Sequence, residues 1–167
     1  MLITPQYLFA SVSRITPAFL QAQGVRALVL DVDNTLTAHG SQQLPAEVAD
    51  WLAQLKAAGV QLMIASNNSK KRVAPFAGRL GLEFEAFCCK PLTTGLARAK
   101  KRFGVPKSQM AIVGDQLFTD RLAASLYGVR AFVVLPRTDD IDRGIRLKRK
   151  LEQPFLRRYY AKGGKLL

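Results

Sequence analysis

The chain has 167 residues, of which 49% are hydrophobic and 22% charged, and 25 Lys and Arg against 12 Asp and Glu give it a net charge of +13. This composition excludes a collagen-like, low-complexity or mostly disordered chain. No apolar stretch approaches the ~18–20 residues that a membrane-spanning helix needs. The length suits one domain, which we expect to cover residues 1–167.

Apolar, β-branched-rich runs alternate with helical patterns along the chain, which is typical of a parallel sheet built from βαβ units. The predicted strands are Arg26–Val32, Val60–Ala65, Phe84–Cys88, Met110–Val113 and Val129–Leu135, and the predicted helices between them are Pro45–Ala58, Lys70–Leu80, Thr94–Phe103 and Thr119–Tyr127. Because the strands are almost continuously apolar, we expect helices on both faces. The sequence thus predicts an α/β fold with a three-layer, Rossmann-like parallel sheet of about five strands.

The two ends of the chain flank this predicted core, which covers about residues 25–135. Thr16 followed by Pro17 predicts a helix start ahead of the first strand. Residues 1–15 carry apolar side chains that either pack on the sheet edge or meet a partner, and we favour packing. Residues 137–167 form a basic C-terminal extension.

The basic residues gather in that extension. From Arg143 onward, nine Lys and Arg stand against one acidic residue, Glu152. A cationic end of this kind indicates contact with phosphate-bearing surfaces, either nucleic acid or anionic lipid, whereas a solvated helix face with a loose tail is the plain alternative. Interleaved apolar residues permit a segment that lies at a membrane interface, although Pro154 predicts that no single regular helix runs through it.

The cysteines indicate the compartment. Cys88 and Cys89 are adjacent and are the two cysteines of the sequence, which also contains a single His. Neither a disulfide framework nor a four-ligand zinc site is therefore expected. We therefore expect a cytoplasmic protein with reduced thiols.

Polar side chains follow four of the predicted strands. They are Asp31 and Asp33 after the first, Ser66 and Asn67 after the second, Lys90 after the third, and Asp115 and Asp120 after the fourth. Ligand sites in open α/β sheets lie beyond the carboxyl ends of the strands, so these groups are expected to converge. Paired carboxylates can serve as nucleophile and acid, and further carboxylates can complete an oxygen-rich magnesium site. The alternative is that these residues only cap turns.

On these residues the sequence resembles the haloacid dehalogenase superfamily of aspartyl phosphatases. DVDNTLT from Asp31 matches the first motif, Ser66 the second, Lys90 the third and GDQLFTD from Gly114 the fourth. The resemblance covers about residues 25–135. The N-terminal piece ITPQYLFASVSRI further resembles the YqeG-type branch of subclass IIIA, which is similar to the phosphatidylglycerophosphate phosphatases of cardiolipin synthesis.

The resemblance implies a Mg²⁺-dependent phosphoric monoester hydrolase that works through an aspartyl-phosphate. Asp31 would be the nucleophile, and Asp33 would protonate the leaving alcohol and then activate water. The Mg²⁺ ligands would be Asp31, the backbone carbonyl of Asp33, and Asp115.

The resemblance also implies the supporting groups. Ser66, Asn67 and Lys90 would bind the phosphate. Thr35 would orient the loop, and Asp120 would position Lys90 or metal-bound water.

Spacing bears on the substrate. Asp31 and Ser66 are 35 residues apart and Ser66 and Lys90 are 24 apart, so neither interval has room for a cap domain. An open crevice suits a substrate attached to something large. We favour hydrolysis of phosphatidylglycerophosphate to phosphatidylglycerol, with the basic extension at the inner face of the membrane. The alternatives are a soluble phosphatase acting on a sugar phosphate or nucleotide, with an oligomer covering the site, and an RNA- or ribosome-associated basic module.

Overall fold

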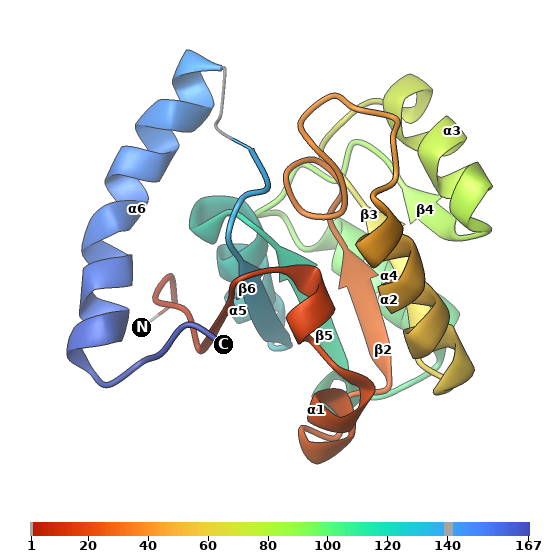
Figure 1. Ribbon diagram of the computed structural model, residues 1–167, viewed down its shortest axis with the longest axis horizontal. Helices are drawn as coiled ribbons and strands as arrows, with labels where there is room; N and C mark the ends of the chain where they lie inside the picture. The colour runs from red at the N-terminus through yellow and green to blue at the C-terminus, as the bar shows by residue number, and fades with distance from the viewer. Residues whose placement is uncertain (1, 139–141) are drawn as a thin grey trace.

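The fold is built around one parallel six-stranded sheet with the order β1-β6-β5-β2-β3-β4 (Figure 1). The computed structural model describes residues 2–138 and 142–167, so residue 1 and the part of the predicted basic extension at 139–141 lie outside the described residues. The strands are β1 (Tyr7–Phe9), β2 (Ala27–Leu30), β3 (Gln61–Ala65), β4 (Glu83–Glu85), β5 (Met110–Gly114) and β6 (Arg130–Val134). This confirms the predicted α/β, Rossmann-like class.

Helices cover both faces of the sheet. They are α1 (Pro17–Ala22), α2 (Ala46–Ala57), α3 (Lys70–Leu80), α4 (Thr94–Phe103), α5 (Leu122–Tyr127) and α6 (Arg143–Ala161), with short 3₁₀ turns η1 (Val12–Arg14) and η2 (Lys107–Gln109) and a π-helical turn η3 (Leu117–Arg121). Alternate residues of a strand point to opposite faces, so Leu28 packs with α1–α3 while Val29 packs with α4 and α5. The sheet is therefore buried on both sides, as its apolar strands predict.

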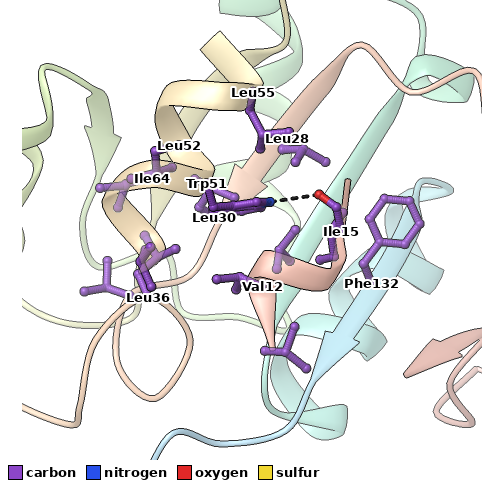
Figure 2. Packing of buried hydrophobic residues seen from close by; sticks show 14 of the residues in the cluster. Val12, Ile15, Leu28, Leu30, Leu36, Trp51, Leu52, Leu55, Ile64 and Phe132 are labelled. Carbon is purple, nitrogen blue, oxygen red and sulfur yellow. Dashed lines mark hydrogen bonds between the residues drawn. The ribbon is translucent and has the colours of Figure 1, made fainter. Parts of the chain in front are cut away.

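The larger of the two cores lies between the sheet and α2 (Figure 2). Trp51 projects from α2 into this core, and its indole Nε1 donates a hydrogen bond of 2.8 Å to the carbonyl oxygen of Ile15. Both residues are buried. The contact fixes the N-terminal segment against a helix that follows the first core strand.

The sheet has one strand more than predicted, because residues 7–9 pair with β6 in parallel, with Tyr7 opposite Phe132. The prediction of about five strands did not include this short edge strand, while the favoured packing of the N-terminal segment on the sheet edge is confirmed. A three-residue strand has too short a pattern to be recognised by itself. Tertiary contacts hold it: the rings of Tyr7, Phe9 and Phe19 pack edge to face around Phe132 at centroid distances of 5.3–6.1 Å.

Helix α6 corrects the expectation for Pro154, which lies inside one helix of 19 residues. The lost backbone hydrogen bond is tolerated because side chains on both sides of the proline anchor the helix. Glu152 accepts hydrogen bonds from the N–H groups of Leu117 and Phe118, and Tyr159 packs in a cluster with Leu8 and Val133. Figure 1 shows α6 alongside the β1–β6 side of the sheet, with its first turn toward the carboxyl ends of the strands.

The connections between the motif-bearing strands are short. From Asp31 to Lys90, a fully described stretch, the chain contains only α2, β3, α3, β4 and the loops that connect them, and no inserted domain, in keeping with the capless prediction. Within the described residues, no helix combines the length and apolar character needed to cross a bilayer.

The contact between Trp51 and Ile15 gives a stability prediction. Trp51→Phe removes the indole donor and leaves the buried Ile15 carbonyl without it, so we expect the free energy of unfolding to fall by about 2 kcal/mol. Urea denaturation followed by circular dichroism measures this. Leu126→Ala on α5, at a side chain that is 57% exposed, is the control and should cost less than about 0.5 kcal/mol. Equal losses in the two variants would contradict the assignment.

Candidate active site

A crevice opens at the carboxyl ends of the strands, where polar and charged side chains follow them. It encloses about 200 Å³ and is lined by Asp31, Asp33, His39, Ser66, Asn67, Asn68, Lys90, Gln116, Thr119, Ile145 and Lys148. Asp31 follows β2, Ser66 follows β3, and Lys90 lies on the loop after β4. The polar residues singled out in the sequence therefore do converge, with two side chains of α6 forming a further wall.

Lys90 is the centre of this cluster. Its Nζ donates hydrogen bonds of 2.7 Å to the carboxylates of Asp31 and Asp120 and one of 2.9 Å to the carbonyl oxygen of Ala65. The Lys90 side chain is 4% exposed. One buried ammonium thus links carboxylates that follow two different strands.

The π-helical turn η3 brings Asp120 to Lys90. The predicted helix from Thr119 starts instead as this wider turn, and a regular helix begins only at Leu122. Such turns are frequent at functional sites. Asp120 packs directly over Gly114, where an added Cβ would overlap its carboxyl group, so glycine is required at the end of β5.

Three carboxylates form a cluster that fits a divalent cation. One oxygen each from Asp31, Asp115 and Asp120 lie within 4.8 Å of one another, and the Thr35 hydroxyl is 3.5 Å from the Asp31 carboxylate and 3.4 Å from that of Asp115. Oxygen ligands of this kind suit Mg²⁺. When all three carboxylates are ionised, their charge exceeds that of the cations of Lys90 and Arg149 by one, so the residues present can hold a metal ion.

Asp33 points its carboxylate toward α3 and away from that cluster. It accepts hydrogen bonds from Asn68 Nδ2 at 2.6 Å, Arg72 Nη2 at 2.9 Å and the backbone N–H of Gly40 at 2.7 Å. Asp33 was expected to bind metal only through its backbone carbonyl, so this side-chain direction does not conflict with that expectation. Asn68 and Arg72 were not predicted as site residues, although both stand beside the second motif in the sequence.

Ser66 and Asn67 follow β3 at the floor of the crevice. The Ser66 hydroxyl accepts the N–H of Asn68 at 3.1 Å. The Asn67 amide pairs with the backbone of Lys90, accepting its N–H at 2.6 Å and donating to its carbonyl at 3.0 Å. The side chain of Asn67 therefore positions Lys90. Asn67 also lines the crevice, and its predicted binding to the substrate phosphate stays a prediction.

Helix α6 reaches the cluster through Arg149. Its guanidinium donates to the Asp115 carboxylate, and Nη1 donates to the Asp115 carbonyl oxygen at 2.6 Å. Glu152, one turn further along, lies 3.3 Å from Arg149 and holds the backbone of η3. From the sequence, Arg149 and Glu152 are predicted only as part of the basic C-terminal extension and not as site residues. No local sequence signal marks them as such.

Burial dominates the electrostatics of the cluster. It raises the pKa of Asp31 to about 6, against the opposing effect of Lys90, and that of Asp115 to about 8, against Arg149. Burial disfavours the charged form of Lys90, yet the carboxylates of Asp120 and Asp31 raise its pKa above the usual value. The positive charge around the carboxylates is therefore too small to offset their burial, and a bound divalent cation would add to it.

The raised pKa values predict a dependence of stability on pH. In the metal-free protein Asp31 and Asp115 bind protons more tightly when folded. Their protonation therefore adds fully to the free energy of unfolding below about pH 4, and this addition is lost as pH rises through about 6 and 8. Mg²⁺ binds the ionised carboxylates, and we expect it to raise the unfolding temperature more at about pH 8 than at about pH 5. Scanning calorimetry with and without Mg²⁺ measures this.

Two results bear on that prediction. Asp115→Asn should remove most of the Mg²⁺ effect at about pH 8, whereas Glu83→Gln, at an exposed carboxylate on β4, should keep it. An equal Mg²⁺ effect at both pH values would contradict the proposed metal cluster.

Comparison with known proteins agrees with this geometry. A family model described as haloacid dehalogenase-like hydrolase matches residues 17–128. The Bacillus subtilis protein named "Probable phosphatase YqeG" is 28% identical over 159 residues, covering 95% of this chain and 92% of the relative. The chloroplastic phosphatidylglycerophosphate phosphatase 1 of Chlamydomonas reinhardtii is 27% identical over 86% of this chain, which spans 57% of that longer protein.

Among solved structures, the fold is similar to the cobalt-bound deoxy-D-mannose-octulosonate 8-phosphate phosphatase of Haemophilus influenzae. The TM-score is 0.52 at 18% identity, over 84% of this chain and 91% of that one. The predicted superfamily and enzyme class are confirmed. With its matching segment and its strand-end carboxylates, the chain belongs to the haloacid dehalogenase-like hydrolase family, as a phosphatase.

Proposed function

We propose that the protein is a Mg²⁺-dependent phosphatase that works through an aspartyl-phosphate and hydrolyses phosphatidylglycerophosphate to phosphatidylglycerol at a membrane surface. The observation that carries the chemistry is the contact of Lys90 with both Asp31 and Asp120, beside Asp115. It gathers a nucleophile, a cation and metal ligands in one crevice. The relative named as a phosphatidylglycerophosphate phosphatase supports the substrate.

The first step is attack by a carboxylate oxygen of Asp31 on phosphorus. A bond forms between that oxygen and phosphorus, the bond to the leaving alcohol breaks, and Asp33 donates a proton to the alcohol. Because the Asp33 carboxylate accepts from three donors, it must exchange one of these contacts for the substrate oxygen. In the second step Asp33 takes a proton from water, which attacks the phosphorus and releases Asp31.

The remaining residues neutralise and orient the reacting groups. Ser66 and Lys90 bind the phosphoryl oxygens, with Asn67 holding the Lys90 backbone. Because the Lys90 ammonium already donates to three oxygens, it must exchange one of these contacts for a phosphoryl oxygen. Asp120 positions the Lys90 ammonium, and Thr35 orients the carboxylates beside it. Asp31, the Asp33 carbonyl and Asp115 would hold Mg²⁺, which would supply the positive charge that lets an anionic phosphate approach a carboxylate.

Replacing the nucleophile tests the mechanism. Asp31→Asn should lower Mg²⁺-dependent hydrolysis of p-nitrophenyl phosphate by about 1,000-fold or more, because the covalent step and its electrostatic support are lost together. Phosphate release and trapping of the aspartyl-phosphate by mass spectrometry measure this. Glu83→Gln is the matched control and should keep the activity. Retained activity in Asp31→Asn, with an intact circular dichroism spectrum, would mean that the nucleophile is elsewhere.

The surface of α6 supports the membrane part of the proposal. Leu147 and Leu151 are 59% and 55% exposed, and Leu147 lines a shallow hollow with Arg143, Arg146 and Lys150. Apolar side chains surrounded by cations are typical of a helix at an anionic lipid interface. On the same helix, Lys148 lines the catalytic crevice, where its ammonium suits the second phosphate of phosphatidylglycerophosphate.

Vesicle binding tests this surface. Sedimentation with phosphatidylglycerol-containing vesicles should retain the protein, and phosphatidylcholine vesicles should not, because the neutral surface lacks the charge attraction. A double variant with Leu147→Ser and Leu151→Ser should bind the anionic vesicles at least about tenfold more weakly, since it removes two side chains that insert. Leu126→Ser on α5, similarly exposed, is the control. Binding to a mixed RNA pool without binding to anionic vesicles would favour the nucleic-acid alternative.

A further inference from the structure

A second cavity lies next to the catalytic crevice, between α6 and the side of the sheet formed by β1 and β6. It encloses about 530 Å³. Its apolar walls are Leu8, Leu117, Val133, Val134, Leu135, Pro136 and Leu156. Cavities of roughly 300–1,000 Å³ with predominantly apolar walls and a few polar groups are the usual form of a ligand site. This groove has both properties.

The catalytic crevice by itself is too small for a whole lipid substrate. Its volume of about 200 Å³ is below the usual range of ligand sites, so it holds the phosphoryl group and little more. The rest of a large substrate must lie outside it. The groove is the adjoining space, because its lining includes Asp115, a member of the carboxylate cluster, and Arg149, which binds that residue.

The charges of the groove are arranged from one end to the other. Arg146 and Arg149 lie at the end toward the crevice. Arg149 is paired there with Asp115 and Glu152, and Arg146 adds a further cation. Leu8 and Leu156 belong to the apolar cluster that joins α6 to β1. A ligand that fits has an anionic head and an apolar chain. A sugar phosphate or a nucleotide leaves the apolar walls without a partner, and an acyl chain buries against them at about 25 cal/mol per Å².

We propose that this groove, here called the acyl groove, binds one acyl chain of an anionic phospholipid while its headgroup lies at the end that carries Arg146. The inference rests on the proposed phospholipid substrate. It adds that the chain is withdrawn from the bilayer and lies under α6. The helix would then determine specificity, since it contributes Arg146, Gln153 and Leu156 to one wall.

A single-chain lipid that carries no phosphate monoester tests the groove apart from catalysis. Oleoyl lysophosphatidylglycerol, kept below its micelle concentration, is titrated into the full-length protein by isothermal calorimetry. Gln153→Trp places a bulky ring in the groove from an exposed position of α6, and Leu135→Trp does so from the opposite wall. Leu126→Trp, at an exposed position of α5 that lines neither the groove nor the cationic hollow of α6, is the matched control. Circular dichroism and the unfolding temperature show whether each variant is folded.

We expect the wild-type protein and Leu126→Trp to bind the probe alike, and both groove variants to bind it at least about tenfold more weakly. Equal binding by the folded groove variants would overturn the acyl groove, and the proposed phosphatase would stand if phosphatidylglycerophosphate is still hydrolysed. Probe binding that depends on the groove, without hydrolysis of that lipid, would overturn the proposed substrate alone. A dimer in sedimentation velocity that Gln153→Trp dissociates, with no probe bound, would assign the groove to a second copy of the chain.

Discussion

The contact of a buried ammonium with two carboxylates is the constraint on which the site depends. Lys90 lies between Asp31 and Asp120 at 2.7 Å from each, and all three side chains are largely withdrawn from water. Buried carboxylates without a counter-charge would be too costly to hold together. Because Lys90 supplies only one positive charge, the cluster keeps an excess of negative charge, and burial still raises the pKa of Asp31 and Asp115. A carboxylate cluster of this kind can hold a divalent cation.

The parallel sheet explains why these groups meet at all. Each of β2, β3, β4 and β5 runs in the same direction, so their carboxyl ends lie at one edge although the residues are far apart in the chain. Local devices then set each side chain. Asn67 holds the backbone that carries Lys90, the turn η3 brings in Asp120, and Gly114 leaves room for it. The rigid scaffold therefore positions the crevice, and short loops supply its chemistry.

Helix α6 lies beyond the segment that the family model matches, residues 17–128, yet it belongs to the site. Arg149 contacts Asp115, and Glu152 holds the turn that contains Asp120. The same helix exposes Leu147 and Leu151 on its outer side and lines the adjoining groove on its inner side. In a fold without a cap domain, this helix takes the position in which specificity for the leaving group can arise.

Local patterns predicted which strand each motif follows, the helices between the strands, and the candidates Asp31, Asp33, Ser66, Lys90, Asp115 and Asp120, because periodicity and strand ends can be recognised in short stretches of sequence. The remaining features depend on contacts between distant parts of the chain. Arg72 contacts Asp33 across 39 residues of sequence, and Arg149 contacts Asp115 across 34. The pairing of β1 and the unbroken course of α6 through Pro154 also depend on contacts of this long range. Their energy comes from burial in the assembled fold, which no short stretch of sequence contains.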